Sequence, residues 1–210
     1  MFDLDGTLVD SSRDIAASAN AALRRMAPGT AEIPLAAILS FVGEGARVLV
    51  ERSLHQAGLD LSADEVLPVY IECYAERLLD TTRLYPGVAE ALDALAGPVL
   101  AVLTNKPGEF SRRILEALGV AGRFAYVLGA GDVPSRKPDP GGLLRLMADA
   151  EAAREDTWMV GDSATDVAVA RAAGVRVAGV TWGFHPAALR AAGPDCLINR
   201  PLDLASLLAA

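Results

Sequence analysis

Apolar residues recur at helical spacing along the stretch that runs from Ser11 to about Tyr85. This spacing predicts a first helix that begins near Ser12 and ends before Pro28-Gly29, and two more over residues 45–57 and 63–79. Ser11 or Ser12 is a suitable cap for the first helix, because its hydroxyl can accept from an early helical N–H. No part of the stretch has a convincing strand pattern, so we expect a helical segment over residues 12–85.

The pattern changes after Pro86-Gly87, where short apolar runs alternate with helical segments. The runs predict strands over residues 99–103, 125–128, 157–160, 175–180 and 196–198. The segments between them predict helices over residues 88–95, 109–118 and 143–150, and from just after Asp162 to Ala173. Such alternation is typical of a doubly wound parallel sheet. We therefore expect an α/β core formed by residues 1–11 and 86–210, with the helical segment inserted into it.

Polar side chains cluster where the expected strands end. The clusters are Asp3 with Asp5, Thr104 with Asn105 and Lys106, Lys137, and Asp162 with Asp166. Ligands of open α/β sheets bind beyond the carboxyl ends of the strands. The sequence therefore predicts a binding or catalytic site at that edge.

Composition restricts the partners of this site. The 210 residues are 52% hydrophobic and 22% charged, which is typical of a globular protein. A net charge of −8 disfavours nucleic acid and anionic membranes as partners. The apolar runs are too short to span a membrane and no leader-like segment begins the chain, so we expect a cytoplasmic protein, as a monomer or homodimer. Cys73 and Cys196 are expected to be reduced thiols.

The carboxylates at the strand ends predict a metal site. Asp3 and Asp5 are poor strand formers, and burying them without a cation is costly. Together with Asp162 they offer the oxygen ligands that Mg²⁺ prefers. With two histidines and no thiolate cluster in the chain, zinc is disfavoured. A turn formed by Asp5 with Gly6 is the structural alternative.

A carboxylate in such a site can also attack phosphorus. Repulsion between Asp3 and a phosphate dianion is on the order of 8 kcal/mol at ~4 Å and an effective dielectric of ~20. Mg²⁺ and a lysine ammonium could offset it, and Lys137, one of only two lysines among the 19 basic residues, is the candidate ammonium. A solvated loop lysine is the alternative interpretation. Thr104 and Asn105 can donate to phosphate oxygens. Asp5 can exchange a proton with the leaving group and then with water.

Asp166 follows Asp162 by four residues, so a helix that starts there would place both on one side. We expect Asp166 to orient Lys137 or a metal-bound water. An exposed helix acid is the alternative interpretation.

These motifs, in this order, resemble those of the haloacid dehalogenase superfamily. They are DLDGT at residues 3–7, Thr104 after an apolar strand, Lys137 in RKPDP, and GDSATD at residues 161–166. The resemblance covers essentially the whole chain and implies a Rossmann-like core, Mg²⁺ dependence and an aspartyl-phosphate intermediate. It implies that Asp3 is nucleophile and metal ligand, and that Asp5 is the acid/base and binds the metal through its carbonyl. It further implies that Asp162 binds the metal, while Thr104 and Lys137 hold the phosphoryl group.

Within that superfamily, the helical segment resembles a small α-helical cap. FVGEGAR at residues 41–47 is similar to the cap loop of phosphoglycolate phosphatases, and TNKP at residues 104–107 and Trp182-Gly183 also resemble that subfamily. The resemblance suggests substrate contacts for Gly43 and Arg47, the latter to a carboxylate; a surface position for Arg47 is the alternative. Only Met1 and Phe2 precede Asp3, where the family has a longer strand. We therefore expect either a misassigned start or a weakened sheet.

The resulting expectation is a Mg²⁺-dependent phosphomonoester hydrolase for a small phosphorylated metabolite such as 2-phosphoglycolate. A phosphosugar mutase or a pyrophosphatase of the same superfamily is an alternative. His55 is the only histidine of the helical segment and that segment has no lysine, which weakens the mutase interpretation. A non-catalytic scaffold that binds phosphate or a protein would tolerate loss of Asp3 or Asp5, and both are present.

Overall fold

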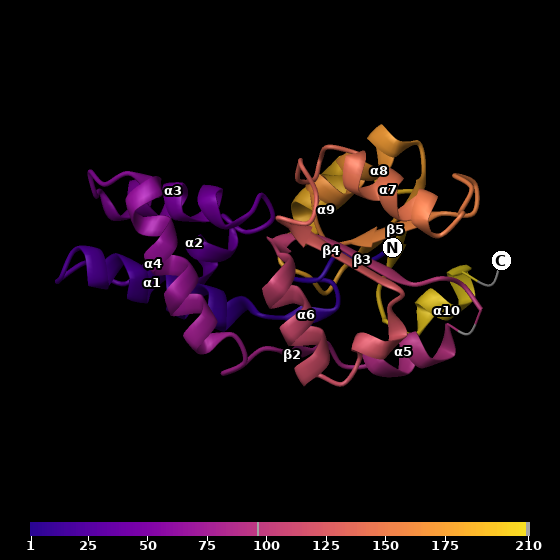
Figure 1. Cartoon of the computed structure of the whole chain (residues 1–210), viewed down its shortest axis with the longest axis horizontal. Helices are drawn as coiled ribbons and strands as arrows, with labels where there is room; N and C mark the ends of the chain where they lie inside the picture. The colour runs from indigo at the N-terminus through magenta and orange to yellow at the C-terminus, as the bar shows by residue number, and fades with distance from the viewer. Residues whose placement is uncertain (96, 209–210) are drawn as a thin grey trace. The chain divides into compact units, whose positions relative to one another are not determined.

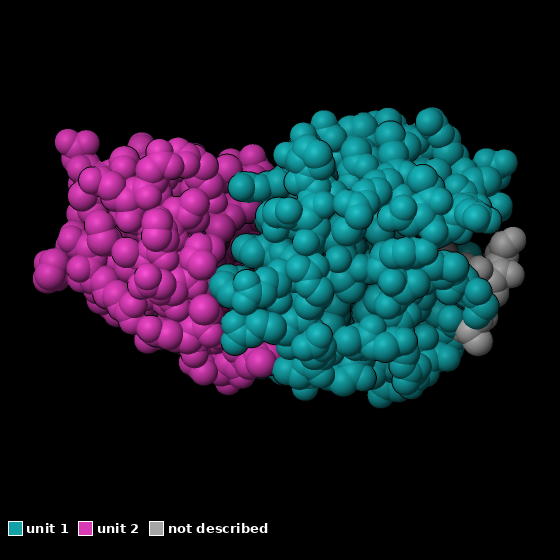
Figure 2. Space-filling model, in the orientation of Figure 1, with its two compact units in different colours: residues 1–10, 83–210 teal, residues 11–82 magenta. Residues whose placement is uncertain are grey.

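The computed structural model describes residues 1–95 and 97–208. The chain divides into two compact units, coloured separately in Figure 2. Met1–Asp10 and Arg83–Ala210 form the core unit, and Ser11–Thr82 form the helical unit. The sequence prediction placed the helical segment at residues 12–85. Among the described residues, no helix combines the length and the apolar character needed to cross a membrane.

The core unit contains a parallel sheet, as the alternating pattern predicted. Its strands are β3 (Ala101–Pro107), β4 (Tyr126–Ala130), β5 (Trp158–Gly161), β6 (Arg176–Val180) and β7 (Cys196–Ile198). β3 pairs with β4, and β6 pairs with both β5 and β7. The strands are near-continuous runs of buried residues, which is the composition expected when helices cover both faces of a sheet.

The opening residues lie in the middle of this sheet. Phe2 forms parallel bridges to Val102 of β3 and to Val160 of β5. Its N–H donates to Ala101 at 2.8 Å, and the N–H of Asp3 donates to the carbonyl of Val160 at 2.9 Å. The order across the sheet is therefore β4, β3, the segment around Phe2, β5, β6 and β7. Asp3 consequently leaves the sheet between two central strands, at their carboxyl ends.

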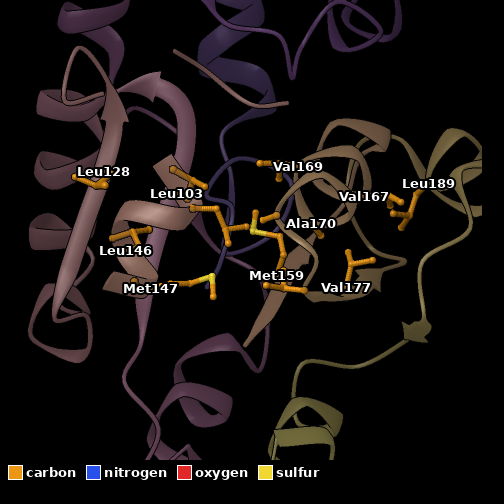
Figure 3. Close-up of a cluster of buried hydrophobic side chains, with 14 residues drawn as sticks. Leu103, Leu128, Leu146, Met147, Met159, Val167, Val169, Ala170, Val177 and Leu189 are labelled. Carbon is orange, nitrogen blue, oxygen red and sulfur yellow. The ribbon is translucent and has the colours of Figure 1, made fainter. Parts of the chain in front are cut away.

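Helices cover both sides of the sheet (Figure 1). They are α5 (Val88–Ala94), α6 (Gly108–Ala117), α7 (Gly141–Asp149), α8 (Ala164–Ala173), α9 (Pro186–Ala192) and α10 (Asp203–Leu208), with a 3-10 turn at Ala121–Arg123. In Figure 1, α7, α8 and α9 lie on one side, and α5, α6 and α10 on the other. A cluster of buried apolar side chains joins α7, α8 and α9 to the strands, with Leu146, Met159 and Leu189 fully buried in it (Figure 3).

The helical unit consists of α1 (Ser12–Met26), α2 (Leu35–Leu39), α3 (Ala46–Ala57) and α4 (Ala63–Arg77). α4 begins with a capping box, in which Ser62 and Glu65 satisfy each other's backbone N–H groups. α3 ends at Gly58, whose left-handed backbone is one that glycine adopts without strain. Both devices match the starts and stops that the apolar spacing indicated.

Some short elements differ from the sequence prediction. β2 (Arg83–Leu84) lies in the stretch where we expected no strand, and it pairs antiparallel with β1 (Val9–Asp10). The helices α2, α9 and α10 were also not predicted. Elements of two to seven residues are too short to establish a period, and β2 is a strand only because β1 lies beside it.

A buried carboxylate secures the end of the helical unit to its beginning. Asp14 in the first turn of α1 is 2% exposed. It accepts from the N–H and the hydroxyl of both Thr81 and Thr82, at 2.6 to 3.0 Å. Four donors therefore compensate the buried charge where water cannot reach it.

Replacing Asp14 should destabilise the helical unit. We expect Asp14→Ala to lower the free energy of unfolding by on the order of 3 kcal/mol, because it leaves the buried N–H and hydroxyl of Thr82, and the part-buried donors of Thr81, without their acceptor. Urea denaturation followed by circular dichroism measures this. Glu32→Ala is the matched control, because the Arg24–Glu32 pair is exposed and its loss should cost under about 1 kcal/mol. Equal losses in the two variants would contradict the structural role of Asp14.

Candidate active site

A tight turn directly after the central segment presents Asp3 and Asp5. The N–H groups of Leu8 and Val9 return to the carbonyl of Leu4, so the chain reverses within a few residues. Gly6 in this turn has a φ of +80°, and a Cβ there would collide with the carboxylate of Asp162. Glycine is therefore required twice, for the backbone angle and for the close approach of Asp162.

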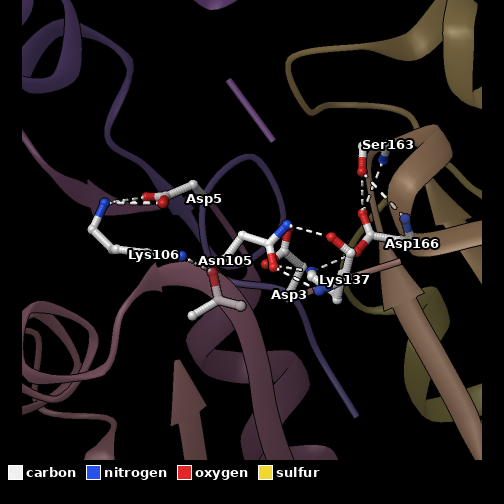
Figure 4. A network of polar contacts seen from close by, with 8 residues as sticks. Asp3, Asp5, Asn105, Lys106, Lys137, Ser163 and Asp166 are labelled. Atoms are coloured by element: carbon white, nitrogen blue, oxygen red, sulfur yellow. Dashed lines mark hydrogen bonds and ion pairs between the residues drawn. The ribbon is translucent and has the colours of Figure 1, made fainter. Parts of the chain in front are cut away.

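Lys137 connects two carboxylates from separate parts of the chain, Asp3 in the opening turn and Asp166 in the first turn of α8. Its ammonium lies 2.7 Å from Asp166 Oδ1 and 2.9 Å from Asp3 Oδ1 (Figure 4). The Lys137 side chain is 2% exposed and that of Asp166 is fully buried. Lys137 therefore forms close ion pairs with both carboxylates, and the shorter contact is the one with Asp166.

Backbone and capping interactions position Lys137 and its partner Asp166. The side-chain amide of Asn105 pairs with the main chain of Lys137, through two hydrogen bonds of 2.9 Å. Asp166 Oδ2 accepts from the N–H and the hydroxyl of Ser163, which forms the capping box at the start of α8. Asn105 therefore has a positioning contact that the sequence did not indicate, beside its predicted role as a donor to phosphate. Thr104 is buried beside Asn105 in β3.

Asp162 directly follows β5, and the loop after β6 contacts its side chain and fixes it in place. The N–H of Phe184 donates to Asp162 Oδ2 at 2.6 Å. Gly183 lies so close to Asp162 that an added Cβ would overlap its side chain and the carbonyl of Gly6. Trp182 donates its ring N–H to the carbonyl of Thr7 at 3.1 Å, which ties this loop to the opening turn. The sequence indicated Trp182-Gly183 only as a family resemblance, without this contact.

Three buried carboxylates converge here with one ammonium. Oxygens of Asp3, Asp162 and Asp166 lie within 4.8 Å of one another. Burial, together with the neighbouring Asp166, raises the pKa of Asp3 to about 6, although Lys137 opposes the shift. Burial and the charges of Asp166 and Asp3 also raise the pKa of Asp162 well above its ordinary value. Burial alone would lower the pKa of Lys137, but the charges of Asp166 and Asp3 outweigh it and raise that pKa.

This donor set suits a hard divalent cation. Carboxylate oxygens are the ligands that such ions prefer, and a second positive centre would offset the repulsion that Lys137 leaves uncompensated. Both oxygens of Asp166 already accept hydrogen bonds, from Lys137 and Ser163. Asp3 and Asp162 are therefore the side chains better placed to bind a metal ion.

The carboxylate of Asp5 is not part of that cluster. Both of its oxygens accept from the ammonium of Lys106, at 2.8 and 2.9 Å. Both lysines of the chain are therefore buried at this edge of the sheet, Lys106 in β3 and Lys137 in the loop after β4. Each forms an ion pair with one aspartate of the opening turn. The sequence indicated Lys106 by the rarity of lysine, by its place beside Asn105 and by the resemblance of TNKP to the phosphatase subfamily, but it did not indicate the contact with Asp5.

The predicted substrate residues Gly43 and Arg47 belong to the helical unit. Gly43 has a φ of +118° in the turn before α3. The exposed guanidinium of Arg47 pairs with Glu51 at 3.0 Å and also with Asp64. These are contacts within the helical unit, and the assignment of both residues to substrate binding stays a prediction from the sequence.

Residues 1–180 match the family model of haloacid dehalogenase-like hydrolases. A phosphoglycolate phosphatase from Pseudomonas putida is 38% identical over 99% of this chain and 77% of the relative. One from Haemophilus influenzae is 37% identical over 99% of this chain and 96% of the relative. The crystal structure of a predicted phosphoglycolate phosphatase from Haemophilus somnus superposes with a TM-score of 0.91, at 34% identity over 98% of this chain and 95% of the other.

The chain therefore belongs to the haloacid dehalogenase-like hydrolases. Within that family it is a phosphatase, similar to phosphoglycolate phosphatases over nearly its whole length.

Removing Lys137 tests the electrostatics of the site. We expect Lys137→Met to lower the free energy of unfolding of the metal-free protein by about 3–5 kcal/mol, because buried carboxylates lose their cation. Arg145→Met, which removes an exposed ion pair with Asp149, should cost less than about 1 kcal/mol. Chemical denaturation with and without a divalent ion measures both variants. The ion should recover part of the deficit of Lys137→Met; a variant as stable as the parent would contradict this account.

Proposed function

We propose that this phosphatase hydrolyses 2-phosphoglycolate with Mg²⁺ through a phosphorylated Asp3. The observation that carries the proposal is the buried carboxylate of Asp3, 2.9 Å from Lys137 in a cluster with Asp162 and Asp166. The substrate is suggested by relatives named phosphoglycolate phosphatases that match nearly the whole chain. The proposal makes Asp3 the nucleophile and Asp5 the acid and base.

Asp3, Asp162 and the main-chain carbonyl of Asp5 would hold the Mg²⁺. When bound, the ion supplies positive charge that offsets the repulsion between Asp3 and the phosphate oxygens. Asp162 suits this role because Phe184 and Gly183 fix its carboxylate in place. Asp166 acts instead on Lys137, to which it is hydrogen-bonded at 2.7 Å.

In the first half of the reaction an oxygen of Asp3 attacks phosphorus. The new bond joins Asp3 to the phosphoryl group, and the bond between phosphorus and the ester oxygen breaks. Asp5 gives its proton to the leaving oxygen, which departs as the alcohol of glycolate. Lys137 and Thr104 donate to the phosphoryl oxygens and hold the group in line.

In the second half, water attacks the phosphorus of the acyl phosphate. Asp5, now ionised, accepts the proton that the water loses. Inorganic phosphate leaves, and the carboxylate of Asp3 is restored. Asp5 can serve both halves because it lies two residues from Asp3 in the same turn.

Replacing the nucleophile should abolish turnover. We expect Asp3→Asn to reduce phosphate release from 2-phosphoglycolate by several orders of magnitude, because an amide does not form the acyl phosphate. Release is measured with and without Mg²⁺, and acid-quenched reactions are digested to find a phosphorylated peptide that contains Asp3.

The matched control is Asp156→Asn, an exposed aspartate that precedes β5 at the opposite end of that strand from Asp162. It should retain the parent activity and its Mg²⁺ requirement. Full activity in Asp3→Asn, or turnover by the parent after thorough removal of metal, would refute the proposed mechanism.

A further inference from the structure

The second lysine of the chain is buried against the proposed acid and base. Lys106 lies at the carboxyl end of β3, and its side chain is 4% exposed. Its ammonium contacts both oxygens of Asp5, whose side chain is 12% exposed (Figure 4). A buried ammonium is costly unless an anion compensates it, so Lys106 needs an anion at every stage of the reaction.

The bidentate contact with Lys106 competes with the proposed task of Asp5. To protonate the leaving group, an oxygen of Asp5 must come within hydrogen-bond distance of the ester oxygen. Lys106 occupies both Asp5 oxygens in the free protein, at 2.8 and 2.9 Å. A substrate anion that binds the ammonium would free these oxygens for the ester oxygen.

The position of the ammonium restricts what can replace Asp5 as its partner. Because Lys106 and the ester oxygen would both bind the same carboxyl group, they would lie within about two hydrogen-bond lengths, ~6 Å, of each other. In 2-phosphoglycolate the carboxylate is attached to the carbon that carries the ester oxygen. An anion in that place can reach the ammonium while the phosphoryl group stays on Lys137 and Asp3.

We propose that Lys106 binds a carboxylate on the leaving group and selects phosphate esters that carry one next to the ester carbon. The inference rests on the proposed function, since it takes Asp5 as the acid and base. Substrate binding then transfers the ammonium from Asp5 to the substrate, which frees a carboxyl oxygen for the leaving group. A neutral leaving group offers no such exchange.

This assignment differs from the predicted one, in which Arg47 binds the carboxylate. The guanidinium of Arg47 already has two carboxylate partners, Glu51 and Asp64, and its side chain is 42% exposed. Solvent weakens the interactions of an exposed cation, so Arg47 would bind a substrate carboxylate less strongly than the buried ammonium of Lys106 would.

A pair of esters that differ only at this group provides the test. One is 2-phosphoglycolate, and the other is 2-hydroxyethyl phosphate, in which a neutral hydroxymethyl group replaces the carboxylate. The readout is the ratio of their kcat/KM values, because damage to Asp5 or to the fold affects both esters and cancels. We expect the parent enzyme to prefer 2-phosphoglycolate, and Lys106→Gln to lower the ratio about 10- to 100-fold, as for loss of a charge-assisted hydrogen bond.

Lys106→Arg keeps the charge and should retain part of the preference, while Arg112→Gln, which removes an exposed cation of α6, should keep the parent ratio. The inference is overturned if Lys106→Gln slows both esters equally, if Arg112→Gln changes the ratio as much, or if Arg47→Ala alone abolishes the preference. Equal kcat/KM values of the parent enzyme for the two esters would also overturn the inference. This outcome does not depend on whether any variant folds. Failure of the parent to hydrolyse either ester with Mg²⁺ would instead refute the proposed function.

Discussion

The structure of the site depends on the mutual repulsion of carboxylates that the fold forces together out of water. Asp3, Asp162 and Asp166 converge within 4.8 Å and are almost completely buried. Such a cluster is stable only when cations are placed among the oxygens. Lys137 supplies one positive charge against three carboxylates, and burial together with the neighbouring aspartates raises the pKa values of Asp3 and Asp162. That remaining imbalance makes the site suited to a divalent ion.

Much of the surrounding architecture serves to hold these groups against their repulsion. Asn105 holds the main chain of Lys137, and Ser163 holds Asp166 in the first turn of α8. Gly6 and Gly183 allow two backbone segments to approach Asp162 more closely than any side chain would permit. The glycines and caps at this edge of the sheet therefore have an electrostatic purpose beyond ending strands and starting helices.

Each of the two lysines forms an ion pair with a different aspartate of the opening turn. Lys137 faces Asp3, and Lys106 faces Asp5, so each of the two aspartates has its own ammonium. If Asp3 takes the phosphoryl group and Asp5 moves the proton, each lysine is next to the part of the substrate that its aspartate acts on. A substrate with two anionic groups on one carbon fragment would then meet two separate cations.

The sequence alone was sufficient for the fold class and for the chemical character of the site. Periodicity is a local property, so the alternation after Pro86-Gly87 predicted the parallel sheet, and the ordered motifs predicted which aspartates stand at its carboxyl edge. Short elements such as β2 escaped prediction, because only the pairing with β1 makes that segment a strand.

The sequence predicted that Asp166 lies beside Lys137, but only the tertiary structure showed that Lys106 meets Asp5 and that Asn105 holds the main chain of Lys137. Lys106 and Asp5 are 101 residues apart, Asn105 and Lys137 are 32 apart, and nothing in the local pattern pairs them. The close approach of Gly183 to Asp162 likewise depends on how the loop after β6 folds back. Residue type determines what a side chain can do, but the distance between side chains from separate strands is set by the packing of the whole sheet.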